Sequence, residues 1–232
     1  MKILAIDTST EACSAALNID NQIIVEFEIA PRRHSELILK QCDKLLAEAD
    51  LRINQLDAIS FGRGPGSFTG LRIAAGVTQG IAFASDLPVI GISTLAAQAQ
   101  KICLLHPEHL YFSAIDARMN EIYWGIYQLG NNQLVTTHSN EAINKASEID
   151  YNQVEPLIGV GSAWNQYQSD LEITLNSSKI NHLYPNILPS AEEIALLAAY
   201  KLQCGEVLTA EKAIPIYLRN DVAKKSTKRV NP

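Results

Sequence analysis

Residues 2–30 read K-I-L-A-I-D-T-S-T-E-A-C-S-A-A-L-N-I-D-N-Q-I-I-V-E-F-E-I-A, and this stretch predicts three β-strands in succession. Ile3–Ile6 is a short apolar run, and Cys13–Leu17 follows a polar turn. Asp20-Asn21 is a typical turn dipeptide, and Gln22–Ile29 after it is rich in β-branched residues. The chain therefore begins with a strand meander that includes a hairpin.

Helices and strands alternate after this meander. Pro31 interrupts the strand pattern, and the apolar spacing then becomes helical, with Ser35 as the expected N-cap. The expected elements are a helix over Ser35–Ala49, a strand over Asp57–Phe61, a helix over Leu71–Ser85, a strand over Pro88–Ile92, and a helix from Ser93 or Thr94 to Leu105. The order in this half is thus β-β-β-α-β-α-β-α.

His106–His109 is the expected boundary to a second half that opens with strands again. After it we expect a strand over Leu110–Ile115, a hairpin of Glu121–Leu129 with Gln133–Thr137, a strand over Leu157–Gly161, and a helix to Cys204 opened by a capping box of Ser190 and Glu193. The repeated order predicts an α/β fold with a duplicated ribonuclease-H-like core. Residues 1–105 would form the first lobe, 106–218 the second, and 219–232 a basic tail with Lys224, Lys225, Lys228 and Arg229.

The composition is typical of a soluble protein from a reducing compartment. The chain has 19 Lys and Arg against 25 Asp and Glu, a formal charge of −6, which argues against a surface devoted to nucleic acid. The four cysteines, Cys13, Cys42, Cys103 and Cys204, are far apart and indicate free thiols rather than a zinc site. Because no stretch has the length of a signal peptide or a membrane span, we expect a cytoplasmic location.

The turn Asp7-Thr8-Ser9-Thr10 has two interpretations. In actin-like ATPases and sugar kinases, an aspartate here holds the metal–water shell of ATP, and the following turn wraps the phosphates. That wrap usually needs a glycine two residues after the aspartate, where this chain has Ser9. A hairpin turn closed by local hydroxyl hydrogen bonds is at least as good an interpretation.

The glycine-rich loop over residues 64–70, G-P-G-S-F-T-G, does not match the common phosphate-binding loops. A Walker A loop requires Lys after its last glycine, where this chain has Leu71. A dinucleotide-binding turn ends the first strand of its unit, whereas this loop comes late and contains Pro65. Generic nucleotide binding is therefore poorly supported by this loop.

The helix after this loop is rich in small residues, with Gly76, Gly80 and Ala84 on one face. Glycine inside a helix costs up to about 1 kcal/mol relative to alanine, so two glycines suggest a close approach of another backbone. The helix either packs closely on its own sheet or is packed on both sides, by its own lobe and by a partner helix. The residues alone do not decide between these two packing arrangements.

No catalytic set of residues follows from the sequence. His106 and His109 straddle Pro107, so they cannot form a zinc-binding pair on one helical face, and His34 has no second ligand at Ile38. The stretch Asp116–Glu121 joins two strands and is expected to hold a turn salt bridge.

Several stretches together closely resemble the TsaB family, the bacterial tRNA threonylcarbamoyladenosine biosynthesis proteins. They are Ile6–Ser14, Gly62–Arg72, Gly91–Leu95, Asp116–Met119, Glu121–Trp124 and Pro215–Arg219. The run G-R-G-P-G-S-F-T-G-L-R is the most specific of them. Asn120 stands where the family usually has glycine, and the resemblance extends to about Ala223.

The resemblance implies a two-lobed actin-like fold and a non-catalytic scaffold that activates a paralogous catalytic (TsaD-type) subunit. That complex transfers a threonylcarbamoyl group to N6 of adenosine 37 in tRNAs reading codons that begin with A. A small (TsaE-type) ATPase completes it, this chain meets tRNA only indirectly, and alone it forms a homodimer. No intrinsic cofactor or metal is expected, and ATP or ADP with a divalent metal would bind only in the complex.

The resemblance also assigns sites. Asp7, Thr8, Ser9 and Thr10 would form a degenerate nucleotide cleft, and the first lobe's two helices would form the partner surface. The residues of that surface would be His34, Leu37, Ile38, Gln41, Gly66, Ser67, Phe68, Thr69, Gly70, Leu71, Arg72, Ala75, Gly76, Gln79, Gly80 and Phe83. The alternatives are a glycoprotease-like peptidase, for which no nucleophile or zinc ligands can be assigned, and an ATP-dependent small-molecule kinase, against which Ser9 argues.

Overall fold

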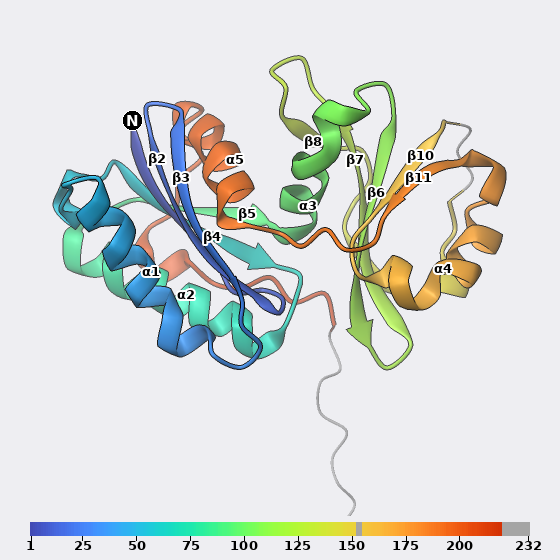
Figure 1. Ribbon diagram of the computed structural model, residues 1–232, viewed down its shortest axis with the longest axis horizontal. Coiled ribbons are helices and arrows are strands. Elements are labelled where there is room, and N and C mark those ends of the chain that lie inside the picture. Colours follow the sequence, from blue (N-terminus) through green and yellow to red (C-terminus); the bar gives the residue numbers. More distant parts are fainter. Residues whose placement is uncertain (152–154, 220–232) are drawn as a thin grey trace, which may run out of the picture.

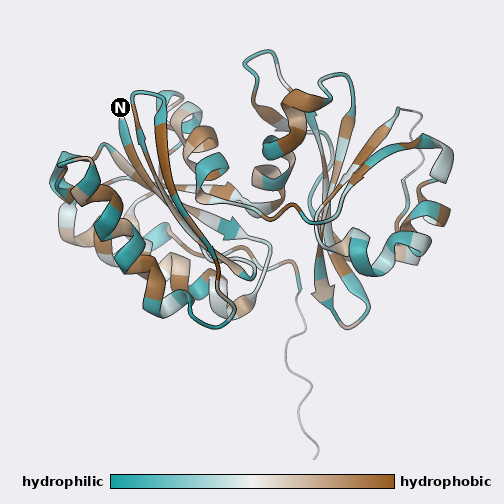
Figure 2. Cartoon of the chain, in the orientation of Figure 1, coloured by the Kyte–Doolittle hydropathy of each residue, from teal (hydrophilic) through white to brown (hydrophobic). Residues whose placement is uncertain are grey.

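Two β-sheets organise the chain, one in each half (Figure 1). The structure is a computed structural model and describes residues 1–151 and 155–219. Hydrophobic residues concentrate along the strands of both sheets (Figure 2). The described residues also contain five short 3-10 helices: Ile53–Gln55, Cys103–Leu105, Ala146–Glu148, Ser177–Lys179 and Ala210–Lys212.

The first sheet has five strands in the order β3-β2-β1-β4-β5. They are β1 (Lys2–Asp7), β2 (Ala12–Ile19), β3 (Gln22–Ile29), β4 (Ala58–Gly64) and β5 (Val89–Ser93). β2 runs antiparallel to both β1 and β3, and β4 and β5 run parallel to β1. β1 is almost wholly buried, because helices cover both faces of the sheet: α1 (His34–Glu48) and α2 (Phe68–Ser85) on one, α5 (Ala191–Gln203) on the other.

The second sheet repeats this pattern in the order β8-β7-β6-β10-β11, with β9 also pairing with β7. Its strands are β6 (Leu110–Arg118), β7 (Glu121–Leu129), β8 (Val135–Thr137), β9 (Ala142–Asn144), β10 (Leu157–Val160) and β11 (Ile180–Tyr184). β6 and β7 are antiparallel, whereas β10 runs parallel to both β6 and β11. The predicted α/β fold with a duplicated ribonuclease-H-like core, the two-lobed actin-like architecture, is confirmed.

Each half contributes a helix that packs on the sheet of the other half. Helix α3 (Thr94–Ile102) packs on β6, β7 and β8 of the second sheet, and α5 packs on the first sheet. The two helices also touch each other, and α4 (Ala163–Thr174) lies outside the second sheet (Figure 1). One apolar cluster consequently runs through both halves, with members such as Ile3, Ile92, Tyr111 and Ile194. The lobe boundaries 1–105, 106–218 and 219–232 stay a prediction, and residues 220–232 of the tail lie outside the described part.

Two predicted helix starts were wrong. Ser35 is not an N-cap: α1 begins one residue earlier, because Arg32 takes a left-handed φ of 68° and the Arg33 carbonyl already accepts from Leu37 at 3.2 Å. α2 begins at Phe68 rather than Leu71, because the Ser67 hydroxyl caps it by accepting from the Gly70 N–H.

Local turn chemistry was predicted correctly at four places. Asp20 and Asn21 both have positive φ in the β2–β3 hairpin, Ser93 caps α3, and Ser190 caps α5. The predicted capping box with Glu193 was wrong, because the Ser190 hydroxyl accepts from the Glu192 N–H at 3.1 Å instead. The expected turn salt bridge joins Arg118 and Asp116 at 3.3 Å. Strands β9 and β11 were not predicted, since they are only three and five residues long. Helix α4 was also missed, although Trp164, Tyr167 and Leu171 follow a helical spacing.

One buried hydrogen bond fixes the start of α5 to the first sheet, and replacing its acceptor should destabilise the protein. The Ala191 N–H donates to the Ser14 hydroxyl at 2.9 Å. Ser14→Ala leaves that N–H unpaired, so we expect the free energy of unfolding to fall by about 1–2 kcal/mol in urea titrations. Ser35→Ala on the exposed side of α1 is the control. Equal stability of both variants would contradict the assignment.

Candidate functional site

The turn of residues 7–10 is enclosed by the glycine-rich loop before α2. Asp7, Thr8 and Ser9 are buried. The Thr8 hydroxyl donates to the Gly70 carbonyl at 2.7 Å, and the Ser67 N–H donates to the Ser9 carbonyl at 2.7 Å. The turn and the loop therefore bind each other through their own polar groups.

Glycine is required in this loop because two backbones touch. A Cβ atom at Gly70 would lie 1.9 Å from the Thr8 carbonyl oxygen, and one at Gly66 would lie 2.5 Å from that of Ser9. Any larger residue at either position would push the loop off the turn. The glycines that suggested a phosphate-binding loop thus serve contact within the chain.

Asp7 is fully buried at the end of β1. One carboxylate oxygen accepts from the Ser9 hydroxyl at 3.0 Å and from the Ser9 N–H at 3.4 Å. The other has no hydrogen-bond partner among the described residues and faces Gly62, where a Cβ would lie 2.1 Å away. Burial raises the pKa of Asp7 to about 7. The hydrogen bonds from Ser9 lower this pKa, and the negative charge of Glu193 raises it further.

Glu193 in the first turn of α5 is a second buried carboxyl group near Asp7. Burial raises its pKa to about 7, opposed by Lys101, whose Nζ lies 3.6 Å from the carboxylate. With Asp7 against Gly62 and the Thr8 hydroxyl engaged by Gly70, the turn as placed does not fit a metal-bound nucleotide.

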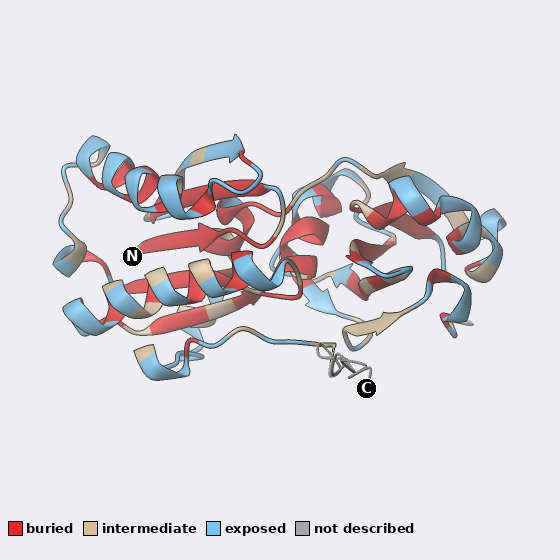
Figure 3. Ribbon diagram, turned by 90° about the horizontal axis from the view of Figure 1, so that it is seen from below, coloured by how far each residue is buried: buried red, intermediate tan, exposed pale blue. Residues whose placement is uncertain are grey.

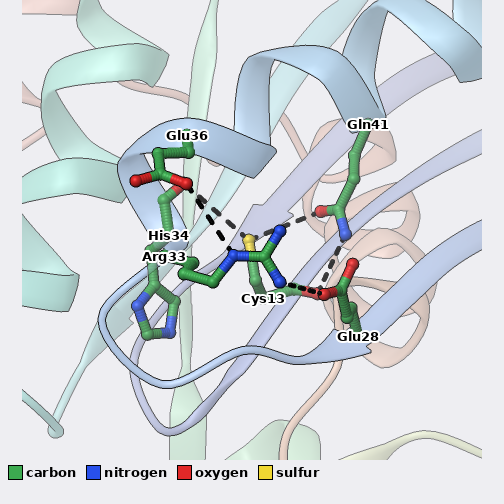
Figure 4. A network of polar contacts seen from close by, with 6 residues as sticks. All are labelled: Cys13, Glu28, Arg33, His34, Glu36 and Gln41. Atoms are coloured by element: carbon green, nitrogen blue, oxygen red, sulfur yellow. Dashed lines mark hydrogen bonds and ion pairs between the residues drawn. The ribbon is translucent and has the colours of Figure 1, made fainter.

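The N-terminus of α1 is tied to the first sheet by the polar contacts in Figure 4. Gln41 donates to the Cys13 carbonyl at 3.2 Å and accepts from the Cys13 thiol at 3.5 Å. Arg33 pairs with Glu28 at 3.0 Å and with Glu36 at 3.7 Å. Gln41 therefore holds α1 on the chain's own sheet, and His34 is buried with its Nε2 unpartnered among the described residues.

The outer faces of α1 and α2 are exposed, whereas their inner faces are buried (Figure 3). On α2, a Cβ atom at Gly76 or Gly80 would meet nothing within 4 Å. Phe83, one turn beyond Gly80, is 77% exposed. Close packing on the chain's own sheet therefore does not explain the helical glycines.

The structure divides the predicted partner surface into buried and exposed residues. The buried ones face the chain's own core: His34, Ile38, Gln41, Gly70, Leu71 and Ala75. Leu37, Gly66 and Gln79 are half-buried, and Gln79 donates to the Ala213 carbonyl at 3.1 Å. The exposed ones lie along α2 and its start: Ser67, Phe68, Thr69, Arg72, Gly76, Gly80 and Phe83. We call this last group the α2 face.

The sequence did not indicate that residues 206–219, which we call the C-terminal strap, return to the first lobe. Leu208 bridges to Val89, and the Ile216 N–H donates to the Arg63 carbonyl at 2.8 Å. Tyr217 then packs against Phe68, with ring centroids 5.3 Å apart. The available signal was the Pro215–Arg219 run, which marked the family without showing its position.

Comparison with known proteins gives a consistent result. A family model described as "TsaD: tRNA N6-adenosine threonylcarbamoyltransferase" matches residues 20–229. The Escherichia coli tRNA threonylcarbamoyladenosine biosynthesis protein TsaB is 38% identical, over 97% of both chains. The chain belongs to the TsaB family.

Two solved structures from Pseudomonas aeruginosa extend this likeness to the TsaB fold. YeaZ superposes with a TM-score of 0.84 at 38% identity, covering 94% of this chain and 99% of that one. The second, named as an uncharacterized protein with similarity to peptidase YeaZ, gives a TM-score of 0.87 at the same identity and coverage. The architecture is thus shared with these structures over 94% of this chain.

Two other kinds of site are absent from the described part of this TsaB-family chain. Within 1–151 and 155–219, no group of three or more His, Cys, Asp or Glu residues is arranged to hold a metal ion. Over the same ranges, no helix is long and apolar enough to cross a membrane.

The raised pKa of Asp7 predicts a pH-dependent stability. The pKa of Asp7 is near 3.8 in the unfolded chain and about 7 in the folded protein. Between these pH values the folded protein therefore binds more protons than the unfolded chain. The free energy of unfolding should therefore fall as pH rises, with Asp7 contributing about 1 kcal/mol per pH unit between pH 5 and 7, and level off above pH 7.

Urea titrations at pH 5, 6, 7 and 8 test this with Asp7→Asn. The variant should show a shallower fall, because the amide does not titrate, and Asp43→Asn on exposed α1 should keep the wild-type slope. Parallel profiles for wild type and Asp7→Asn would show that Asp7 is ionised in the folded protein.

Proposed function

We propose that this chain is a non-catalytic scaffold and activating subunit of the complex that adds a threonylcarbamoyl group to N6 of adenosine 37 in tRNAs reading A-starting codons. Its E. coli relative is named a tRNA threonylcarbamoyladenosine biosynthesis protein, and the matching family model is named for the transferase. The proposed partner is the paralogous catalytic subunit, and tRNA is met through that partner. The complex would work in the cytoplasm, where tRNA is modified.

The exposed glycines of α2 carry the proposal. Gly76 and Gly80 each cost roughly 1 kcal/mol relative to alanine inside a helix, and no atom of the described chain uses the space above them. That cost is offset if a partner helix packs directly on the α2 backbone. Phe83 beside them supplies a large aromatic group of the kind that anchors protein interfaces.

The closed turn at Asp7 supports an accessory rather than a catalytic role. Its hydroxyl, N–H and carbonyl groups bind one another and the loop before α2. ATP or ADP with a divalent metal would accordingly enter only in the complex, together with the small ATPase. The same α2 face would let the chain form a homodimer when the catalytic partner is absent.

Gly80→Leu should separate folding from binding. Leucine favours a helix more than glycine by about 0.5–1 kcal/mol, and the site is open, so the isolated variant should be as stable as wild type or more stable. Its side chain would hold a partner helix away from the α2 backbone. We expect loss of co-purification with the catalytic subunit and loss of threonylcarbamoyladenosine formation in the reconstituted reaction.

Ser169→Leu, on the exposed side of α4 in the second half, is the matched control and should retain binding. Wild-type affinity in Gly80→Leu would show that the partner docks elsewhere. Failure of the wild type itself to bind the catalytic subunit would refute the scaffold function.

A further inference from the structure

Arg72 lies on the α2 face one helical turn before Gly76, and its side chain is held in a defined position. Its guanidinium carbon lies 4.0 Å from the centroid of the Phe68 ring. Its Nε–H donates to the Tyr217 hydroxyl at 3.3 Å. A cation over an aromatic face is stabilised there, and the side chain loses less entropy on binding than a free arginine would.

Arg72 is held by aromatic residues and not by a carboxylate, and it shares the lack of an ion pair with Arg32 and Arg52 among the described arginines. Four of them pair with carboxylates: Arg33 with Glu28, Arg63 with Glu141, Arg118 with Asp116, and Arg219 with Glu121. Among the described residues, no carboxylate lies within ion-pair distance of Arg72, and its two Nη groups make no hydrogen bond. The fork of the guanidinium is therefore exposed, charged and already oriented.

The position of Arg72 on the helix connects it to the proposed interface. Arg72, Gly76, Gly80 and Phe83 follow one another at spacings of four, four and three residues, which is one face of an α-helix. With a rise of about 1.5 Å per residue, Arg72 lies about 6 Å along the axis from Gly76. A helix packed on the glycines must pass the guanidinium.

We propose that Arg72 is a specificity-determining anchor of this interface and takes a carboxylate, Asp or Glu, from a helix of the catalytic partner. The inference rests on the proposed function. The guanidinium fork matches a carboxylate in a bidentate geometry, which a lysine ammonium cannot reproduce. Phe68 and Tyr217 act as positioning residues, and the hydrogen bond from Ile216 to Arg63 holds Tyr217 in place.

Two other occupants fit the surface less well. RNA would use Arg72 for a phosphate, but the α2 face has no second cation for a phosphate backbone to contact. Its other residues are Ser67, Phe68, Thr69, Gly76, Gly80 and Phe83. A second copy packed α2 against α2 supplies no carboxylate, because residues 68–85 contain no Asp or Glu. A helix of a different protein that carries Asp or Glu would pair with the Arg72 charge and pack closely on the glycines.

The test measures affinity for the full-length catalytic subunit by calorimetry at two salt concentrations. Arg72→Glu should weaken binding about 100-fold, since a charge meets a like charge in a desolvated interface. Arg72→Lys should recover only part of this, and Tyr217→Phe should cost a few-fold through lost positioning. Lys145→Glu, a charge reversal on the second half, is the matched control and should leave affinity unchanged.

A charge swap identifies the occupant. Each Asp and Glu on the partner's interface helices is changed to Arg, and one of these should restore binding of Arg72→Glu while weakening binding of the wild type. Wild-type affinity in Arg72→Glu, or failure of every swap to restore it, would overturn the inference. So would an Arg72→Glu chain that binds the subunit normally but weakens tRNA binding to the complex, or alters only self-association.

Gly80→Leu, measured alongside, separates this inference from the proposed function. Loss of binding in Gly80→Leu with normal binding in Arg72→Glu would leave the scaffold function standing and remove the role of Arg72. Normal binding in both variants would reject the α2 face altogether.

Discussion

Thr8 and Gly70 touch through their backbones, and a Cβ atom at Gly70 would lie 1.9 Å from the Thr8 carbonyl oxygen. Together with the hydrogen bond from Ser67 to Ser9, this contact clamps the β1–β2 turn against the start of α2. It buries Asp7 behind Gly62, fixes where α2 begins and sets which side of α2 faces solvent. The closed turn and the open helix face are two results of one packing constraint.

Helix α2 consequently has two unlike sides. Its inner side, with Leu71 and Ala75, packs on the chain's own sheet and contributes to the core. Its outer side holds glycines with empty space above them beside an exposed phenylalanine. The exposed glycines lower the stability of α2 in a monomer and leave room for a partner helix. This is consistent with a subunit whose activity depends on a partner.

The two halves share one apolar cluster in addition to a cluster that each half has of its own. α3 packs on the second sheet, α5 packs on the first, and the C-terminal strap returns to the start of α2. The strap thereby places Tyr217 beside Phe68 and Arg72, three residues brought together from positions far apart in the chain. The geometry of the α2 face thus depends on the last described residues as well as on the helix itself.

The sequence by itself determined the strand meander, the alternation of helices and strands, the duplicated core and the family. These follow from local properties: β-branched runs, helical spacing, turn residues at Asp20-Asn21, and caps at Ser93 and Ser190. It also placed the small residues of α2 on one face, but it could not say whether that face was buried, because spacing does not show what lies opposite.

Only the tertiary structure decided that Gly66 and Gly70 meet the chain's own turn while Gly76 and Gly80 meet nothing. It also assigned His34, Ile38 and Gln41 to the core and brought the strap to Arg72. Contacts between segments distant in sequence decide these matters, and they depend on how whole elements pack rather than on any local pattern.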